Sequence, residues 1–162
     1  MKTRKMVYLA LLSAIAIILH MVDHYLSAPL PFGVRFGIAN IISLMAIELY
    51  GIKEMWMINA MRVVISGLLT GSIMTYPFFM SCGGVFLSSL ALSILHIFHF
   101  LPMVSTSIIS AICHNIGQII VISFIISSKA VVPYIFIVLI PSIPTGILTA
   151  LIAQEALKRI KT

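Results

Sequence analysis

Charged residues are scarce in this chain, and acidic residues are the scarcest. Only 9% of its 162 residues are charged, with ten lysines and arginines against four acidic residues, whereas soluble domains carry about 25% charged residues. So few charges cannot cover a polar exterior, and the mean hydropathy of +1.19 is correspondingly high. The composition therefore excludes a water-soluble globular domain and predicts a protein surrounded by lipid.

Cysteine is nearly absent as well. The two cysteines, Cys82 and Cys113, belong to no C-x-x-C pair and to no Cys/His ligand spacing. The sequence therefore indicates neither a disulfide framework nor a zinc site. His20, Asp23 and His24 have a spacing that could surround a metal, but the signal is weak and an interfacial polar cap explains them better. We expect no metal site.

Basic residues gather at the two ends of the chain. Six of the ten lie in the first five and last five residues, namely Lys2, Arg4, Lys5, Lys158, Arg159 and Lys161. This bias is typical of cytoplasmic flanks, and the groove-sized basic patch with aromatics expected for nucleic-acid binding is lacking. We therefore predict a multi-pass protein of the cytoplasmic membrane with both termini in the cytoplasm.

Long apolar stretches fill the rest of the chain. About 20 apolar residues cross a bilayer core of about 30 Å as a helix. We predict six transmembrane helices, at residues 6–22, 36–50, 53–74, 79–98, 104–126 and 131–156. An even number of spans returns the C-terminus to the side of the N-terminus, in agreement with the basic ends. The predicted fold is one all-α membrane domain over residues 1–162, a bundle of six transmembrane helices.

Strongly polar side chains interrupt the predicted spans at a few positions. Arg62 lies near the middle of the third span, where a charge costs at least about 2.5–3.5 kcal/mol, so it must face a cavity or a partner. The fifth span contains the run HNIGQ at residues 114–118, and Asn40 lies in the second span. We expect these side chains to point into the bundle.

Such side chains would combine positive charge with amide donors in one cavity. This chemistry suits a small ligand that bears a carboxylate or phosphate. The predicted ligand-binding residues are Arg35, Asn40, Arg62, His114, Asn115 and Gln118. Two structural alternatives stay open at this point: an ion pair between Arg62 and Glu48, and hydrogen bonds between helices for the HNIGQ run.

Small residues form a stripe on the first span. Ala10 and Ala14 are four residues apart, so they lie one above the other on the helix surface. Stripes of this kind let helix backbones approach closely in lipid. The stripe is either packed inside this protein or is a docking face for a separate membrane subunit. The pairs Gly67 with Gly71 and Gly146 with Ala150 leave the same two interpretations open.

Three runs of sequence resemble a known family. They are PFGVRFGIAN at residues 31–40, MRVVISGLLTGS at residues 61–72 and AICHNIGQIIV at residues 111–121. In this order they resemble the membrane proteins labelled heptaprenyl diphosphate synthase component I, also called the Gx transporter family. The resemblance covers nearly the whole chain. That family is similar to the S components of energy-coupling factor (ECF) vitamin transporters, which have six helices and cytoplasmic termini.

The likeness to S components implies a function in uptake. It implies a ligand site near the outer face, covered by the connection at residues 23–35, for a small anionic vitamin-like or precursor compound. In S components an AxxxA motif of the first helix docks on the T component, and Ala10 and Ala14 match that motif. The implied partners are the T component and two ATP-binding subunits. ATP would be used by these subunits, since this chain has no Walker lysine loop.

The family's other label implies a different partner, a soluble catalytic subunit of a prenyl diphosphate synthase. Familiar synthases hold magnesium against a diphosphate with aspartate-rich motifs, yet Asp23 is the only aspartate here. The four acidic residues are too scattered to hold a magnesium cluster. We therefore expect no catalytic residues and no intrinsic cofactor in this chain. As the alternative to uptake, it would be a membrane accessory subunit in isoprenoid or menaquinone biosynthesis.

Overall fold

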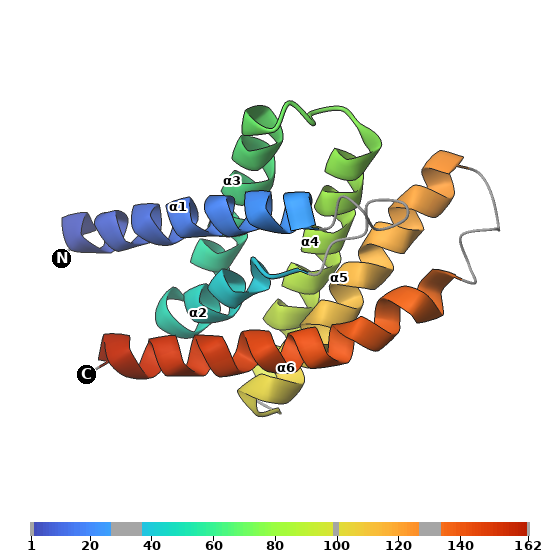
Figure 1. Ribbon diagram of the computed structural model, residues 1–162. Helices are drawn as coiled ribbons and strands as arrows, with labels where there is room; N and C mark the ends of the chain where they lie inside the picture. Colours follow the sequence, from blue (N-terminus) through green and yellow to red (C-terminus); the bar gives the residue numbers. More distant parts are fainter. Residues whose placement is uncertain (1, 27–36, 99–100, 127–133, 162) are drawn as a thin grey trace.

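The protein is helical throughout the part of the chain that the structure describes. The computed structural model describes residues 2–26, 37–98, 101–126 and 134–161. Six helices follow one another in these ranges (Figure 1): α1 Lys2–Leu26, α2 Asn40–Tyr50, α3 Ile52–Leu69, α4 Tyr76–Phe98, α5 Met103–Ile126 and α6 Tyr134–Lys161. The all-α prediction is confirmed, and each predicted span overlaps one helix.

Four of these helices are long and apolar enough to cross a membrane. Their candidate spans are Thr3–Leu26 in α1, Tyr76–Phe98 in α4, Met103–Ile126 in α5 and Val138–Ile160 in α6. The apolar α2 has only 11 residues, about 16 Å at 1.5 Å per residue, which is too short for a core of about 30 Å. The membrane character of the chain is confirmed, while six full crossings stay a prediction.

Both termini lie at the same end of the molecule (Figure 1). The N-terminal half of α1 and the C-terminal half of α6 extend toward this end, with α2 between the two helices. This arrangement is what an even number of crossings requires. That the shared end faces the cytoplasm stays a prediction, because it rests on the basic flanks alone.

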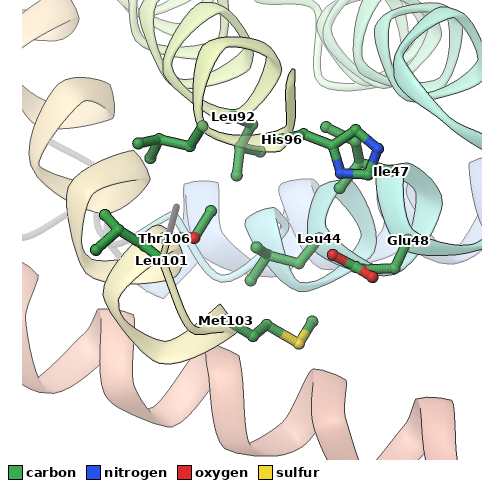
Figure 2. Close-up of a pocket in the computed structure, with 9 residues that line it drawn as sticks. Leu44, Ile47, Glu48, Leu92, His96, Leu101, Met103 and Thr106 are labelled. Carbon is green, nitrogen blue, oxygen red and sulfur yellow. The ribbon is translucent and has the colours of Figure 1, made fainter. Parts of the chain in front are cut away.

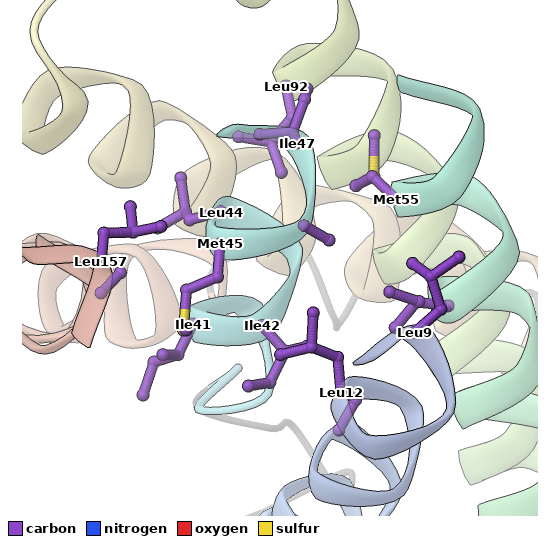
Figure 3. Packing of buried hydrophobic residues seen from close by; sticks show 14 residues of the cluster. Leu9, Leu12, Ile41, Ile42, Leu44, Met45, Ile47, Met55, Leu92 and Leu157 are labelled. Atoms are coloured by element: carbon purple, nitrogen blue, oxygen red, sulfur yellow. The ribbon is translucent and has the colours of Figure 1, made fainter. Parts of the chain in front are cut away.

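The core of the bundle is built around α2. Residues 40–47 of this helix are all buried, and α2 contacts each of the other five helices. A helix that is apolar all round lies either in a protein core or in lipid, and these contacts place α2 in the core. Figure 3 shows the surrounding side chains of this core, which include Leu9, Leu12, Met55, Leu92 and Leu157.

Two glycines set the ends of α2. Gly37 has φ 77° and Gly51 has φ 98°, a region of backbone conformation that favours glycine. The Gly37 N–H donates to Asp23 Oδ2 at 2.9 Å, and the Gly51 N–H donates to the carbonyls of Ala46 and Ile47. The prediction of a helix from residue 36 is therefore wrong at its start, because the chain still turns at residues 37–39.

The predicted third span is wrong at its end. It extends to residue 74, but α3 ends at Leu69, and the chain then turns with positive φ at Gly71 and Met74. Apolar residues continue through this turn, so hydropathy alone places the boundary too late. For α1 and α6 the predicted spans end too early, at residues 22 and 156. The helical backbones continue past these apolar stretches to Leu26 and Lys161.

Glycines bring three helices into close contact. A Cβ added at Gly117 of α5 would lie 2.3 Å from the Gly83 carbonyl oxygen of α4. A Cβ added at Gly146 of α6 would lie 2.8 Å from the Ile108 Cα of α5, and Ala150 is fully buried. Small residues permit such close approach between membrane helices. The stripe of Gly146 and Ala150 therefore packs inside this chain.

Candidate functional site

Arg62 of α3 is the largest fully buried side chain among the described residues, with 1% of its surface exposed. Its Nη1 donates to the Ala39 carbonyl oxygen at 2.6 Å, and its Nη2 donates to Asn40 Oδ1 at 3.0 Å. Glu48 is exposed and lies near the other end of α2, about 12 Å along the helix. The alternative of an Arg62–Glu48 ion pair therefore does not fit, and Arg62 instead ties α3 to the beginning of α2.

Arg62 also fixes the orientation of the Asn40 amide. A guanidinium only donates hydrogen bonds, so Oδ1 faces Arg62 and Nδ2 points elsewhere. Asn40 is 4% exposed, and its Nδ2 has no hydrogen-bond partner within the described ranges. A buried donor left without an acceptor costs about 1–3 kcal/mol. This amide is therefore available to an acceptor atom of a ligand.

His114 and Gln118 approach the same region from α5. Their Nε2 atoms are 2.8 Å apart, and both side chains are buried. A Cβ added at Gly37 would lie 3.1 Å from Asn40 Nδ2 and 3.5 Å from His114 Cδ2, so the Gly37 backbone lies against both side chains. The structure thus brings together four predicted ligand residues, Asn40, Arg62, His114 and Gln118, which we call the Arg62 cluster.

Asn115 faces a different neighbour. Its Nδ2 donates to Ser142 Oγ at 2.6 Å and contacts the Val138 carbonyl oxygen at 3.5 Å, both on α6. Consecutive residues point about 100° apart around a helix, which separates Asn115 from His114. Asn115 therefore joins α5 to α6, as the interhelical alternative predicts. Arg35 lies outside the described residues, and its role in binding stays a prediction.

A second buried network, which the sequence analysis missed, lies one turn from Arg62. Asn59 Oδ1 accepts a hydrogen bond from Ser43 Oγ at 2.7 Å, and Asn59 Nδ2 donates to Ser89 Oγ at 2.7 Å. The network connects α2, α3 and α4. The signal was present, because Asn59, Arg62 and Ser66 recur on one face of a helix.

Asp23 is buried at the end of α1. It is 1% exposed and His20 is 3% exposed, so both side chains face the protein interior, while a place at the membrane interface stays a prediction. The Asp23 carboxylate accepts the Gly37 N–H and so fixes where the chain enters α2. Within the described ranges, no three histidine, cysteine or acidic side chains form a group that could hold a metal.

A small cavity opens where α2 and α4 end and α5 begins. Its volume is about 130 Å³, and Glu48, His96 and Thr106 are its polar lining among six apolar residues. Figure 2 shows the Glu48 carboxylate beside the His96 ring. None of the five predicted ligand residues that the structure describes lines this cavity, which is therefore separate from the Arg62 cluster.

Ala10 and Ala14 are exposed on the surface of α1. Their neighbours Val7, Leu11 and Ile18 are also exposed, by 63%, 57% and 60%. The stripe therefore does not pack against another described helix of this chain. Of the two interpretations of the stripe, docking of a separate subunit is the one that stays open.

Comparison with known proteins places the chain in one family. A family model described as heptaprenyl diphosphate synthase component I matches residues 12–156. Neither the curated proteins nor the solved structures include a match. The matched region takes in all of α2 to α5 and most of α1 and α6, together with the complete Arg62 cluster. The chain therefore belongs to the heptaprenyl diphosphate synthase component I family.

Proposed function

We propose that this chain is a non-catalytic membrane subunit of a polyprenyl diphosphate synthase, and that a soluble catalytic subunit is its partner. The family match over residues 12–156 carries the proposal. The positions of the carboxylates support a non-catalytic role. Lys5 bonds Glu54, Arg159 bonds Glu155, and the Gly37 N–H donates to Asp23. Glu48 lines the separate small cavity. Carboxylates dispersed in this way cannot surround magnesium, so catalysis falls to the partner.

The chemistry of chain elongation explains why a synthase would need a membrane subunit. Every added isoprene unit makes the product more apolar, and each buried CH₂ group favours an apolar environment by about 0.8 kcal/mol. A growing chain therefore leaves water while its diphosphate stays there. A subunit with four membrane-length apolar helices would hold the catalytic partner at the surface where the product enters the bilayer.

A synthase assay tests this proposal. The soluble catalytic subunit is supplied with isopentenyl and farnesyl diphosphate, in the presence of liposomes that contain this chain or of empty liposomes of the same lipids. We expect a higher rate or a longer product with the chain present. Equal rates and equal product lengths in the two preparations would contradict the proposal.

The Arg62 cluster favours a second candidate, an S-component-like subunit of an ECF transporter. The buried guanidinium, the Asn40 donor that no described residue satisfies and the adjacent His114 and Gln118 suit a small anionic compound. The exposed Ala10 and Ala14 suit docking on a T component. Two ATP-binding subunits would then complete the transporter and use ATP.

Reconstitution separates the second candidate from the first. Proteoliposomes with this chain, a T component and two ATP-binding subunits should retain and import a small anionic compound only when ATP is supplied. Native mass spectrometry of the protein in mild detergent identifies the retained compound. Import that persists without the ATP-binding subunits would instead indicate a stand-alone carrier.

A further inference from the structure

An apolar groove runs between α1 and α6, with α2 as its floor. Its volume is about 580 Å³, within the range of about 300–1,000 Å³ found for ligand sites. Apart from Tyr8 and Tyr50, every described side chain that lines it is apolar. Figure 1 shows the three helices that form the groove, with α2 between α1 and α6.

The groove is open along its side. Its floor residues Ile41 and Met45 are 7% and 6% exposed, whereas the wall residues Ile15 of α1 and Ile152 of α6 are 39% and 45% exposed. In a bilayer this opening faces hydrocarbon. If the groove were empty, its lining atoms would lose dispersion contacts on one side. A flexible hydrocarbon chain would restore these contacts, so it is the occupant that fits the groove.

The groove and the Arg62 cluster lie on opposite faces of α2. Ile38, Ile41, Ile42, Met45 and Leu49 line the groove and recur at intervals of three and four residues, which places them on one face of the helix. Arg62 bonds the side chain of Asn40, which projects from the other face. The two sites are therefore separate.

One end of the groove carries positive charge. Tyr8 and Tyr50 line this end, and Lys5 Nζ lies 5.9 Å from the centre of the Tyr50 ring. Lys158 and Arg159 directly precede the lining residue Ile160 on α6. Two carboxylates oppose this charge, since Lys5 bonds Glu54 and Arg159 bonds Glu155. Because basic residues outnumber acidic ones at both chain ends, the field at this end favours an anionic group.

We propose that the groove holds the hydrocarbon chain of a polyprenyl diphosphate, with the diphosphate at the basic end. The inference rests on the proposed synthase partnership, which supplies a ligand of this chemistry. The apolar slot takes the prenyl chain from the side of the bilayer, and Lys5, Lys158 and Arg159 bind the phosphate oxygens. The chain thereby receives the product that its catalytic partner makes.

Photo-crosslinking of the full-length protein tests this directly. The protein is placed in phosphatidylcholine nanodiscs without the catalytic partner, and the probe is a geranylgeranyl diphosphate analogue with a benzophenone in its prenyl chain. We expect crosslinked peptides from the groove-facing residues of α1 and α6. Unlabelled geranylgeranyl diphosphate should compete at least tenfold better than inorganic diphosphate or phosphatidylglycerol.

Variants on the exposed walls supply matched controls. Ile15→Trp and Ile152→Trp fill the groove from its two sides and should each reduce labelling at least tenfold. Ile18→Trp adds the same bulk on α1 at a residue that is 60% exposed and does not line the groove, so its labelling should equal that of the unmodified protein. Lys5→Gln should weaken competition by geranylgeranyl diphosphate several-fold, and Glu54→Gln should strengthen it.

The outcomes separate this inference from the proposed function. Crosslinks outside the groove, or equal loss of labelling with Ile18→Trp, would overturn it. Equal competition by phosphatidylglycerol would also overturn it and would make the groove a phospholipid slot. Groove labelling without any effect in the synthase assay would contradict only the proposed synthase subunit. Synthase stimulation without groove labelling would contradict only the proposed binding of a polyprenyl diphosphate in the groove. The unmodified protein gives the crosslink map even if a variant fails to fold.

Discussion

Replacing Arg62 and Asn40 singly and together measures how strongly α3 is tied to the start of α2. The two side chains share the 3.0 Å bond from Nη2 to Oδ1, and Arg62 makes a further 2.6 Å bond to the Ala39 carbonyl oxygen. Arg62→Met and Asn40→Leu remove the polar groups while they keep apolar volume. The double variant removes both partners of the shared bond.

The magnitudes follow from the bonds that each variant loses. A hydrogen bond to a charged group contributes about 1.5–3 kcal/mol, and Asn40→Leu also removes the Nδ2 donor that no described residue satisfies, whose burial costs about 1–3 kcal/mol. Asn40→Leu should therefore lower the unfolding free energy by about 0–2 kcal/mol. Arg62→Met loses two such bonds but recovers about 2.5–3.5 kcal/mol because no guanidinium is buried. Its net loss should be about 0–3 kcal/mol. The double variant should lose about 1.5–3 kcal/mol less than the sum of the single losses.

Equilibrium unfolding in mixed micelles with increasing dodecyl sulfate gives these free energies. Trp56 is the only tryptophan, and its Nε1 donates to Ser93 Oγ across α3 and α4, so its fluorescence reports on the packing of the bundle. The exposed pair Glu155–Arg159 serves as the control cycle, with an expected coupling of about 0.3–0.5 kcal/mol. Single losses for Arg62 and Asn40 that add to within about 0.5 kcal/mol would refute the reasoning.

Three further predictions test the packing and the second candidate function. Gly117→Ala drives a Cβ into the α4 backbone and should cost about 1–3 kcal/mol in the same titration, whereas Gly67→Ala meets side-chain atoms of Phe78 and Ile73 rather than a neighbouring backbone and should cost less. Ala10→Trp and Ala14→Trp should leave stability within about 0.5 kcal/mol but abolish co-purification with a T component; an intact complex would contradict docking. Arg62→Ala should abolish retention of a small anion in native mass spectrometry while membrane expression persists, and unchanged binding by calorimetry would remove Arg62 from the site.

The helices could be predicted because hydropathy reports directly on contact with lipid. Stretches of about 20 apolar residues correspond to α1, α4, α5 and α6, whose lengths and compositions fit a membrane crossing. Their ends were less predictable. A helix ends where its backbone turns, as at Gly71 and Met74 after α3, and apolar residues can lie on either side of such a turn.

Hydropathy did not reveal that α2 is a core helix. A stretch that faces lipid and a stretch that faces protein are equally apolar, so the short α2 resembles an incomplete span in the sequence. Its buried residues 40–47 and its contacts with all five other helices show the difference. Only the neighbours of a helix decide whether its apolar surface meets lipid or protein.

The sequence predicted which polar residues lie inside the bundle but not which of them lie together. Polar residues inside an apolar stretch must find partners because the bilayer offers none, and this selected Asn40, Arg62, His114, Asn115 and Gln118. Which partner each one finds depends on the rotation of its helix. One residue step turns a side chain by about 100°, which directs His114 toward Asn40 and Asn115 toward α6.

The sequence by itself determined that this chain is an all-helical membrane protein with basic ends and no cluster of carboxylates, because those properties are sums over residues. Tertiary structure decided which residues share a surface. It buried α2, joined Arg62 to the start of that helix and left an apolar groove between α1 and α6. These features arise from contacts between segments far apart in the chain, and the relative rotation and tilt of the helices determine which side chains meet.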